Sequence, residues 1–368
     1  MKIGILKETP KSEKRVSISP NIAKQLINLG FEILMEENAG FASAYKNSDY
    51  QNVGVKIEKK EVVFKEAKIL IKINPFTQED LKLVNPSHIL MSQLYHKSNA
   101  ELIKAIAATG ATAFSMDAMP RISRAQDMDV LSSQSNLAGY KAVILGANEM
   151  TKIFPLMMTA AGTITPSKVL IYGVGVAGLQ AIATAKRLGA VVEATDIRLE
   201  TKEQTESLGA KFISVDNSNE EKSEGGYAKE ASEDYVRRQK EAVNKSLFQA
   251  DLVITTAMVP GRKSPVLISE EQVKQMKNGA VIIDLAAAQG GNCEISEMDK
   301  TVIKYGVKII GTSMAPESVS TNASELYAKN MFNFLKHLTD DKNEFKWELE
   351  EEITDETLIV QEGKIRKN

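Results

Sequence analysis

Short apolar runs alternate with segments of helical periodicity along the whole chain. Five runs of strand length fall in the first 115 residues, at 2–6, 31–36, 68–73, 89–94 and 112–115. Ser19 and Pro20, a capping serine and a proline at the first helical position, predict a helix that ends near Leu29, and a second helix is expected over 99–108. Strands that alternate with helices pair in parallel and are covered on both faces. The pattern therefore predicts a first α/β domain.

The second half of the chain repeats this alternation. Six runs are predicted strands, at 169–172, 191–195, 211–214, 252–255, 281–284 and 308–310. Two longer segments are predicted helices: 136–150 is expected to join two domains, and 324–338 to return to the first. A hairpin with Glu362 and Gly363 at its turn is expected over 357–365, and the polar segment 217–226 is expected to be an exposed loop. We predict domains at 1–135 with 317–368, and at 136–316.

A glycine-rich turn follows the first strand of the second domain. The run at 169–172 leads into Gly173, Gly175 and Gly178, then a helix-forming segment, another apolar run and Asp196, 18 residues after Gly178. This order of strand, turn, helix, strand and acid is the dinucleotide-binding fingerprint. Gly173 allows the tight turn, Gly175 lets the backbone approach a pyrophosphate, and Gly178 lets helix and strand pack closely. The alternative is that these glycines form a turn in some other kind of α/β protein. That alternative accounts for the glycines but not for the flanking strands, the helix and Asp196.

The acid at the end of the second strand bears on the choice of nucleotide. Asp196 can bind both hydroxyls of a ribose and repels a 2′-phosphate, which favours NAD over NADP, whereas Arg198 argues weakly the other way. We predict an α/β fold of two domains: a doubly wound Rossmann domain for NAD(H), inserted in a second, flavodoxin-like or Rossmann-like α/β domain. Ala257 directly follows a predicted strand, so it is expected at the carboxyl edge of the sheet, where ligands bind.

The composition narrows the functional classes. Of the 368 residues, 43% are hydrophobic and 26% are charged, and the net charge of −2 gives no reason to expect a nucleic-acid partner. Cys293 is the single cysteine, which excludes a disulfide framework, favours a reducing compartment and is expected to be buried and structural rather than nucleophilic. The N-terminus does not resemble a signal peptide, and the longest apolar stretch, 169–185, is too short to span a membrane. No metal site and no membrane crossing are expected.

The segment 121–132 is unusually rich in polar chemistry, with two guanidiniums, an amide, two carboxylates and hydroxyls in twelve residues. By composition alone it would be a solvated loop with internal salt bridges. With its continuation to Tyr140, however, it resembles the signature loop of the soluble NAD(H)-binding component (domain I, in the α subunit) of proton-translocating NAD(P) transhydrogenases. The resemblance extends over essentially the whole chain, through further segments at 157–163, 173–190, 225–230, 284–286 and 290–293.

The resemblance implies direct hydride transfer from NADH to NADP⁺. NADP(H) is held on a separate β subunit in that family, and the transfer is coupled to proton translocation by membrane-spanning subunits. The chain would then be a homodimeric, cytoplasmic protein, peripheral on the inner face of the cytoplasmic membrane through its partners. Hydride transfer between two nicotinamides needs no general acid or base, only close and oriented C4 atoms.

The resemblance also implies the site residues. Four would act at the nicotinamide half of NAD(H), with Gln126 steering the ribose and two others holding each other and the loop: Arg121, Gln126, Asp129 and Ser132. Asp129 and Arg121 are the pair expected to hold each other. Tyr227 matches the tyrosine of a mobile loop that closes over bound nucleotide, and it follows two glycines, which suits a hinge. The cofactor-binding residues are thus expected to be Gly173, Gly175, Val176, Ala177, Gly178, Asp196, Ile197, Arg198, Tyr227 and Ala257.

Two alternatives remain open at this point. Alanine dehydrogenases are related to this family and share the pattern of Lys7, Glu8 and Arg15, but they carry a catalytic lysine and, about twenty residues later, a catalytic histidine. Asn74 stands at the lysine position, and Tyr95 aligns with the histidine, although His96 is one place away. Asparagine cannot protonate a carbonyl or imine, so that chemistry is not expected, and Arg15 is expected to be structural. A non-catalytic NAD-binding sensor is the second alternative.

Overall fold

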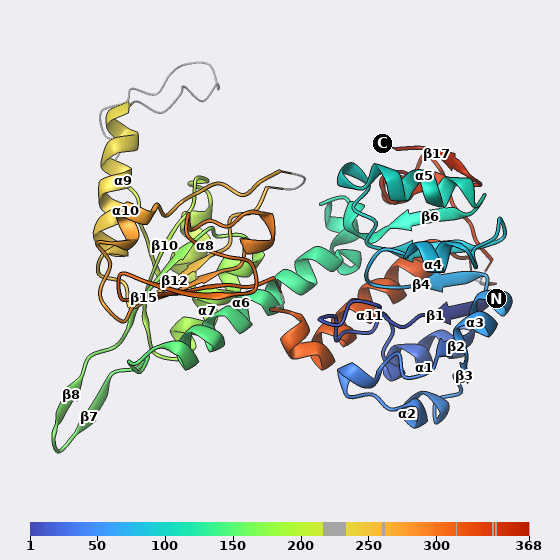
Figure 1. Cartoon of the computed structure of the whole chain (residues 1–368), viewed down its shortest axis with the longest axis horizontal. Helices are drawn as coiled ribbons and strands as arrows, with labels where there is room; N and C mark the ends of the chain where they lie inside the picture. The colour runs from blue at the N-terminus through green and yellow to red at the C-terminus, as the bar shows by residue number, and fades with distance from the viewer. Residues whose placement is uncertain (216–232, 260–261, 314, 341, 343, 368) are drawn as a thin grey trace. The chain divides into compact units, whose positions relative to one another are not determined.

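The computed structural model describes residues 1–215, 233–259, 262–313, 315–340, 342 and 344–367 (Figure 1). The chain divides into two compact units. Unit 1 comprises Met1–Gln134 and Pro316–Asn368, and unit 2 comprises Ser135–Ala315. Each unit is built around its own sheet.

The sheet of unit 1 has the order β17-β16-β6-β5-β4-β1-β2-β3. Its parallel strands are β1 (Lys2–Ile5), β2 (Glu32–Glu36), β3 (Lys56–Glu58), β4 (Ile69–Ile71), β5 (Ile89–Ser92) and β6 (Thr112–Ser115). Two antiparallel strands from the end of the chain extend it, β16 (Leu358–Gln361) and β17 (Lys364–Ile365). The five strands predicted here and the final hairpin are confirmed, whereas β3 was not predicted.

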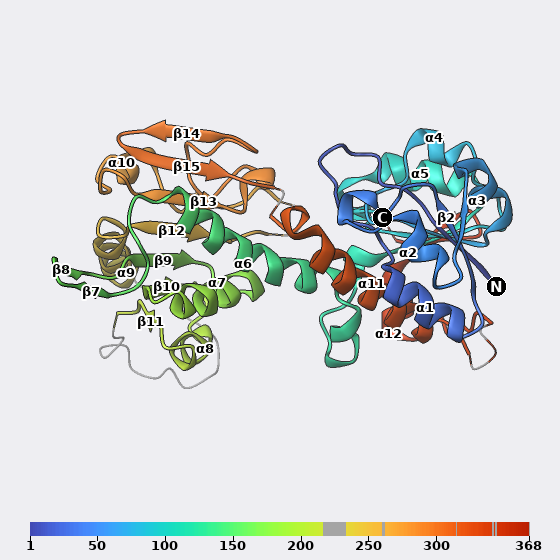
Figure 2. The same ribbon diagram turned by 90° about the horizontal axis from the view of Figure 1, so that it is seen from below.

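Helices cover both faces of this sheet, as alternate side chains of its strands require (Figure 2). Ile69 and Ile71 of β4 pack with α1 (Pro20–Asn28) and α11 (Ser320–His337), whereas Leu70 packs with α3 (Lys60–Glu66) and α5 (Ala100–Ala108). The predicted helix caps at Ser19, whose side chain accepts from the backbone N–H of Ile22. The other helical segments of unit 1 are α2 (Asn47–Gln51), α4 (Gln78–Leu81), α12 (Glu352–Thr357), η1 (Phe41–Ser43), η2 (His96–Ser98), η3 (Met116–Ala118), η4 (Ser123–Met128) and η6 (Glu317–Val319).

The sheet of unit 2 has the order β11-β10-β9-β12-β13-β15-β14. Its parallel strands are β9 (Lys168–Tyr172), β10 (Val191–Thr195), β11 (Lys211–Phe212), β12 (Leu252–Thr255), β13 (Val281–Asp284) and β15 (Val307–Gly311), and β14 (Thr301–Lys304) is antiparallel at the edge. Numbered along the chain, the parallel strands run 3-2-1-4-5-6, the order of a doubly wound dinucleotide fold. The six predicted strands and the predicted fold class are confirmed, and β14 was not predicted.

Helices cover the unit 2 sheet on both faces as well (Figure 2). Side chains of α6 (Val130–Glu149) and α7 (Val176–Arg187) pack with Val169 and Ile171 of β9, and α9 (Glu233–Leu247) and α10 (Glu270–Val273) pack with Leu170. Two more helical segments are α8 (Thr201–Ser207) and η5 (Ala287–Gln289). None of the helices in the described ranges combines the length and the apolar character that a membrane crossing requires.

A separate two-stranded hairpin belongs to unit 2. Its strands β7 (Met157–Thr159) and β8 (Gly162–Ile164) pair with each other in antiparallel fashion and not with the main sheet. Every residue of both strands is exposed, and the hairpin projects from the unit in Figure 1. The sequence analysis did not predict these strands.

Candidate nucleotide-binding site

The three glycines of the turn between β9 and α7 each have a different environment. Gly173 has a φ of +90°, in the left-handed region that favours glycine. A Cβ on Gly178 would lie 1.9 Å from the carbonyl oxygen of Gly173, so only glycine allows the first turn of α7 to approach β9 this closely. A Cβ on Gly175 would meet no heavy atom within 4 Å. The turn is therefore tight at Gly173, closely packed at Gly178 and open at Gly175.

The N-terminus of α7 is a suitable place for an anion. Gly175 is its cap residue and, within the described structure, no side chain accepts a hydrogen bond from the first turn. The N–H groups of Val176 and Ala177 lie in that first turn, and uncapped N–H groups at a helix N-terminus favour phosphate binding. Gly139 of α6 packs closely against this first turn, because a Cβ there would lie 2.0 Å from the carbonyl oxygen of Ala177.

Asp196 follows β10 and has a side chain that is only 6% exposed. Its carboxylate accepts a hydrogen bond of 2.6 Å from the N–H of Val174 and contacts the Arg198 guanidinium, with Nε at 3.0 Å from one oxygen and Nη2 at 3.0 Å from the other. Burial by itself would raise the pKa of Asp196, but the hydrogen bonds from Arg198 and Val174 together hold it below its ordinary value. The group beside the glycine turn is thus an ionised carboxylate, and the half-exposed Arg198 shares it.

The strand order reverses between β9 and β12, so the segments that follow these two strands flank the position where doubly wound folds bind ligands. After β12, Thr256 donates from its hydroxyl to the carbonyl oxygens of Tyr172, at 3.2 Å, and Gly173, at 3.1 Å. Ala257, predicted at this edge, is held on both sides by the buried Asn292, which accepts from its N–H at 3.0 Å and donates to its carbonyl at 2.8 Å. Ile197, two residues after β10, is 97% exposed.

The buried Asp284 supports this edge from β13. Its two oxygens accept hydrogen bonds from the Thr255 hydroxyl, at 3.0 Å, and from the N–H groups of Asn292, at 2.9 Å, and Cys293, at 3.0 Å. Sequence reasoning noted Asp284 and Asn292 only as members of a resembling segment, and it missed Thr256 entirely. Cys293 is buried, as expected, and burial raises the pKa of its thiol to about 11.

The loop 121–132 lies in unit 1 and is firmly anchored. Ala125 and Met128 are buried in the core of that unit, and the carbonyl oxygen of Asp127 accepts hydrogen bonds from Asn330, at 2.8 Å, and Asn333, at 3.0 Å. Gln126, between these anchors, is exposed, and its amide has no hydrogen-bond partner among the described residues. The loop therefore exposes the side-chain amide of Gln126, while the backbone on either side of it is held by buried residues and hydrogen bonds.

Asp129 and Ser132 form the start of α6. Ser132 donates to Asp129 from its N–H, at 2.9 Å, and from its hydroxyl, at 2.6 Å, which is the pattern of a helix N-cap. The helix consequently begins earlier than the predicted 136. Between Asp129 and Arg121, both described, no ion pair forms: the carboxylate is taken by Ser132, and Arg121 is exposed. The expected pairing of Asp129 with Arg121 is therefore not present in the structure.

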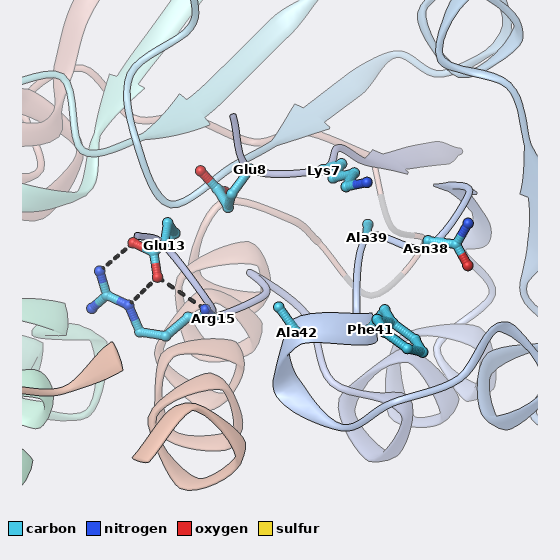
Figure 3. Close-up of a pocket in the computed structure, with 8 residues that line it drawn as sticks. All are labelled: Lys7, Glu8, Glu13, Arg15, Asn38, Ala39, Phe41 and Ala42. Carbon is cyan, nitrogen blue, oxygen red and sulfur yellow. Dashed lines mark hydrogen bonds and ion pairs between the residues drawn. The ribbon is translucent and has the colours of Figure 1, made fainter. Parts of the chain in front are cut away.

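A cavity of about 480 Å³ lies in unit 1 beside Lys7, Glu8 and Arg15, the residues of the pattern shared with alanine dehydrogenases (Figure 3). It is lined by Lys7, Glu8, Glu13, Arg15, Asn38, Ala39, Phe41 and Ala42. Asn74, at the lysine position, donates from its amide to Glu8, at 3.1 Å, and to Glu13, at 2.9 Å. Burial raises the pKa of Glu8, whereas Glu13, despite its burial, is held below its ordinary pKa by Arg15 and Asn74.

Tyr95, which aligns with the dehydrogenase histidine, and its neighbour His96 both lie near the charge of Asp117. Burial raises the pKa of Tyr95 to about 12, and its hydroxyl donates to Gln93. An amide cannot act as a general acid or base, and a phenol with so high a pKa is a weak one.

Tyr227, with Gly225 and Gly226 before it, lies outside the described residues, as does the loop expected at 217–226.

Two protein-family models match this chain. The family model described as alanine dehydrogenase/PNT, N-terminal domain, matches residues 4–138, and the one described as alanine dehydrogenase/PNT, C-terminal domain, matches residues 142–368. The chain belongs to the alanine dehydrogenase/PNT family.

Within this family, the chain is more similar to proteins named as transhydrogenases than to one named as a dehydrogenase. It is 49% identical to the first part of NAD(P) transhydrogenase subunit alpha of Rhodospirillum rubrum, over 99% of the chain and 97% of that protein. The crystal structure of a transhydrogenase from Sinorhizobium meliloti is 39% identical with a TM-score of 0.91 and covers 99% of the chain and 100% of its own. Alanine dehydrogenase 2 of Staphylococcus aureus is 28% identical over 87% of the chain and 82% of that protein. The resemblance noted in the sequence is confirmed.

Proposed function

We propose that this chain is the NAD(H)-binding subunit of a proton-pumping NAD(P) transhydrogenase. The observation that carries the proposal is the 49% identity, over nearly the full length of both chains, to the first part of a transhydrogenase subunit alpha. The amide and phenol at the positions of the dehydrogenase acid and base support it, because hydride transfer between nicotinamides requires neither. The reaction moves a hydride from C4 of NADH to C4 of NADP⁺ and leaves NAD⁺ and NADPH, so no proton is exchanged with the site.

NAD(H) would bind through the residues that the fingerprint and the resemblance indicate. The pyrophosphate would lie at the turn from Gly173 to Gly178, against the N–H groups of Val176 and Ala177, and the ribose hydroxyls would bind the ionised Asp196. Ile197, Arg198 and Ala257 would line the same edge, and Tyr227 would close over the nucleotide. At the nicotinamide half, Gln126 would orient the ribose, with Arg121, Asp129 and Ser132 beside it.

The partners follow from the same reaction. NADP(H) would sit on a β subunit, and proton translocation would take place in membrane-spanning subunits that hold this chain peripherally on the inner face of the cytoplasmic membrane. A homodimer belongs to the proposal, and the exposed apolar side chains of the β7–β8 hairpin support it: Leu156, Met157, Met158 and Ile164. A two-stranded hairpin on its own is marginally stable, so these side chains are suited to a protein contact.

The proposal is tested by following the hydride itself. NADH carrying deuterium at C4 would be offered to the chain alone, to the chain with its purified NADP(H)-binding partner and NADP⁺, and to the chain with pyruvate and ammonia. Deuterium recovered in NADPH only in the second tube, and none in alanine, is the expected result. Turnover with pyruvate and ammonia would instead establish an amino-acid dehydrogenase, and NADH binding without transfer in any tube would favour an NAD-binding sensor.

A further inference from the structure

The chain passes between its two units at two points, from Gln134 to Ser135 and from Ala315 to Pro316. We call these points the two crossings. Gln134 is the last residue of unit 1 before the first crossing and lies on α6. Glu317 is the second residue of unit 1 after the return crossing and begins η6. Whatever holds Gln134 and Glu317 therefore fixes where both connections leave unit 1.

A single buried side chain contacts both of these residues. Arg15, only 8% exposed, donates from Nη1 to the amide oxygen of Gln134 at 2.9 Å, and its Nη2 lies 3.0 Å from a carboxylate oxygen of Glu317. Its other contacts are to Glu13, from Nε at 2.8 Å and from Nη2 at 2.7 Å. Figure 3 shows the bonds to Glu13, which hold the guanidinium in place. The guanidinium is thus taken by two carboxylates and an amide, all from unit 1.

The contacts continue from Gln134 to the loop that carries Gln126. The Gln134 amide donates to the carbonyl oxygen of Ala323 on α11 at 3.1 Å. Its neighbour Ser133 donates to Asn330 on the same helix at 2.7 Å, and Asn330 donates to the carbonyl oxygen of Asp127 at 2.8 Å. Arg15 is therefore connected, through α6 and α11, to the backbone beside Gln126.

The sequence assigns Arg15 no function, and its contacts argue against one obvious role. Two carboxylates already pair with the guanidinium, so it cannot hold the carboxylate of a small substrate without leaving a buried acid unpaired, which is costly. Burial opposes its charge, but Glu13 and Glu317 raise the pKa of Arg15 above its ordinary value, so the guanidinium stays charged.

We propose that Arg15 is a positioning residue for hydride transfer, which fixes to unit 1 both points at which the chain passes to the nucleotide-binding unit. This inference rests on the proposed function. Catalysis by positioning is sensitive to small displacements, and an error of about 1 Å can cost about 100-fold in rate. Arg15 touches neither nucleotide in this role and acts through Gln134 and Glu317.

Two variants test whether the contacts of Arg15 with Gln134 and Glu317 affect hydride transfer independently of the stability of unit 1. Arg15→Lys keeps a charge beside Glu13 but loses the planar fork that reaches Gln134 and Glu317 together. The double variant Gln134→Ala with Glu317→Ala keeps Arg15 and its pair with Glu13 and removes both crossing contacts, together with the hydrogen bond from Gln134 to the Ala323 carbonyl. Arg366→Lys is the matched control, because Arg366 is also a partly buried arginine of unit 1 that pairs with an acid, Asp355, at 2.8 Å.

Three quantities would be measured for each protein: NADH affinity, turnover of hydride transfer with the NADP(H)-binding partner, and the spread of distances between the units. The spread comes from double electron–electron resonance between spin labels at Lys24→Cys in unit 1 and Lys245→Cys in unit 2, both exposed; the native Cys293 is buried and stays unlabelled. Both test variants are expected to lower turnover by about 10- to 100-fold, to broaden the distance distribution, and to leave NADH affinity close to that of the control. The thermal midpoint is expected to fall less in the double variant than in Arg15→Lys, because the double variant removes the acid at position 317 together with its contact to Arg15, whereas Arg15→Lys leaves that acid in place.

Several outcomes would overturn the inference. Wild-type turnover and an unchanged distance distribution in both variants would show that Arg15 only stabilises unit 1. A loss of turnover that follows a lowered thermal midpoint, with an unchanged distribution, would show the same. If the wild-type protein itself transfers no hydride, the proposed function fails, whereas the distance distributions still test whether Arg15 holds the crossings.

Discussion

At the scale of single residues, we propose that Asp196 decides which nucleotide binds at the β9–α7 turn. Its carboxylate is ionised and already bound to the N–H of Val174 and to Arg198. A ribose with free hydroxyls can donate to such a group, while a 2′-phosphate would place a second negative charge against it. Arg198 is the only neighbour in direct contact that could offset that charge, and it is committed to Asp196 in the described structure.

We expect Asp196→Ala to weaken NADH binding by about 1.5–3 kcal/mol, the usual contribution of hydrogen bonds to a charged group, and to affect NADPH binding far less. Titration calorimetry with each nucleotide measures the difference. Glu193→Ala is the matched control, because Glu193 is an acid of β10, three residues before Asp196, and pairs with Lys211 at 3.1 Å. Equal losses for the two nucleotides would contradict the role of Asp196 in nucleotide choice.

Gln126 is predicted to act in transfer and not in binding. It is exposed, while Ala125 and Met128 beside it are buried, so a change of its side chain leaves the loop in place. Gln126→Asn shortens the amide by one methylene and should slow hydride transfer by about 10- to 100-fold with nearly unchanged NADH affinity. Stopped-flow transfer rates and NADH titrations measure the two effects, with the exposed Gln51→Asn as control. Normal transfer combined with a large loss of affinity would count against the prediction.

At the scale of elements, the turn from β9 to α7 contains a glycine required for packing, Gly178, and one proposed for nucleotide binding, Gly175. Gly178→Ala places a Cβ 1.9 Å from the carbonyl oxygen of Gly173, so helix and strand must move apart, at a cost of about 1–3 kcal/mol of unfolding free energy. Gly175→Ala meets no atom of the protein within 4 Å and should cost less than about 1 kcal/mol, mostly through the change of helix cap.

Gly175→Ala is also predicted to change the affinity for NADH. We expect Gly175→Ala to lose NADH affinity by about tenfold or more without a matching loss of stability, because the added methyl occupies the space through which the backbone approaches the pyrophosphate. Denaturant unfolding and NADH titration of both variants test this. Tight NADH binding by Gly175→Ala would mean that the pyrophosphate does not lie at this turn.

The elements that the sequence predicted are those with continuous apolar runs. Central strands such as β4 and β12 are buried on both faces, so every position is apolar or nearly so and the run is visible. The strands β3 and β14 were missed because they carry no buried apolar run: none of the three residues of β3 is buried, and three of the four residues of β14 are exposed. The hairpin strands β7 and β8 were missed because they are exposed throughout.

The sequence predicted the part of the candidate site whose residues lie close together along the chain. The glycine turn and Asp196 lie within 24 residues of one another and form a local pattern. The groups that brace the site could not be found in this way, because their contacts join distant segments of the chain: Asn292 holds Ala257, and Asn330 holds Asp127. Arg15 with Gln134 is a further example, since neither residue type at such a separation carries a signal of its own.

At the scale of the whole molecule, the β7–β8 hairpin predicts the state of association. Met158 of β7 is 77% exposed, and Met157 and Ile164 of the hairpin and Leu156 just before it are exposed apolar residues as well. If the proposed dimer forms through this hairpin, Met158→Asp should raise the dimer dissociation constant by about 30-fold or more, the effect of about 2 kcal/mol at a central interface residue. Sedimentation velocity over a range of concentrations measures this change.

The matched control is Met298→Asp, the same substitution at a methionine of unit 2 that is 54% exposed and lies outside the hairpin. It should leave the dimer unchanged, because one charge at an exposed site away from an interface does not affect association. NADH binding adds a further readout: each chain carries its own glycine turn, so the Met158→Asp monomer should still bind NADH with the affinity of the dimer. A dimer that persists in Met158→Asp would place the interface elsewhere on the surface, and a wild-type monomer at all concentrations would remove the homodimer from the proposed assembly.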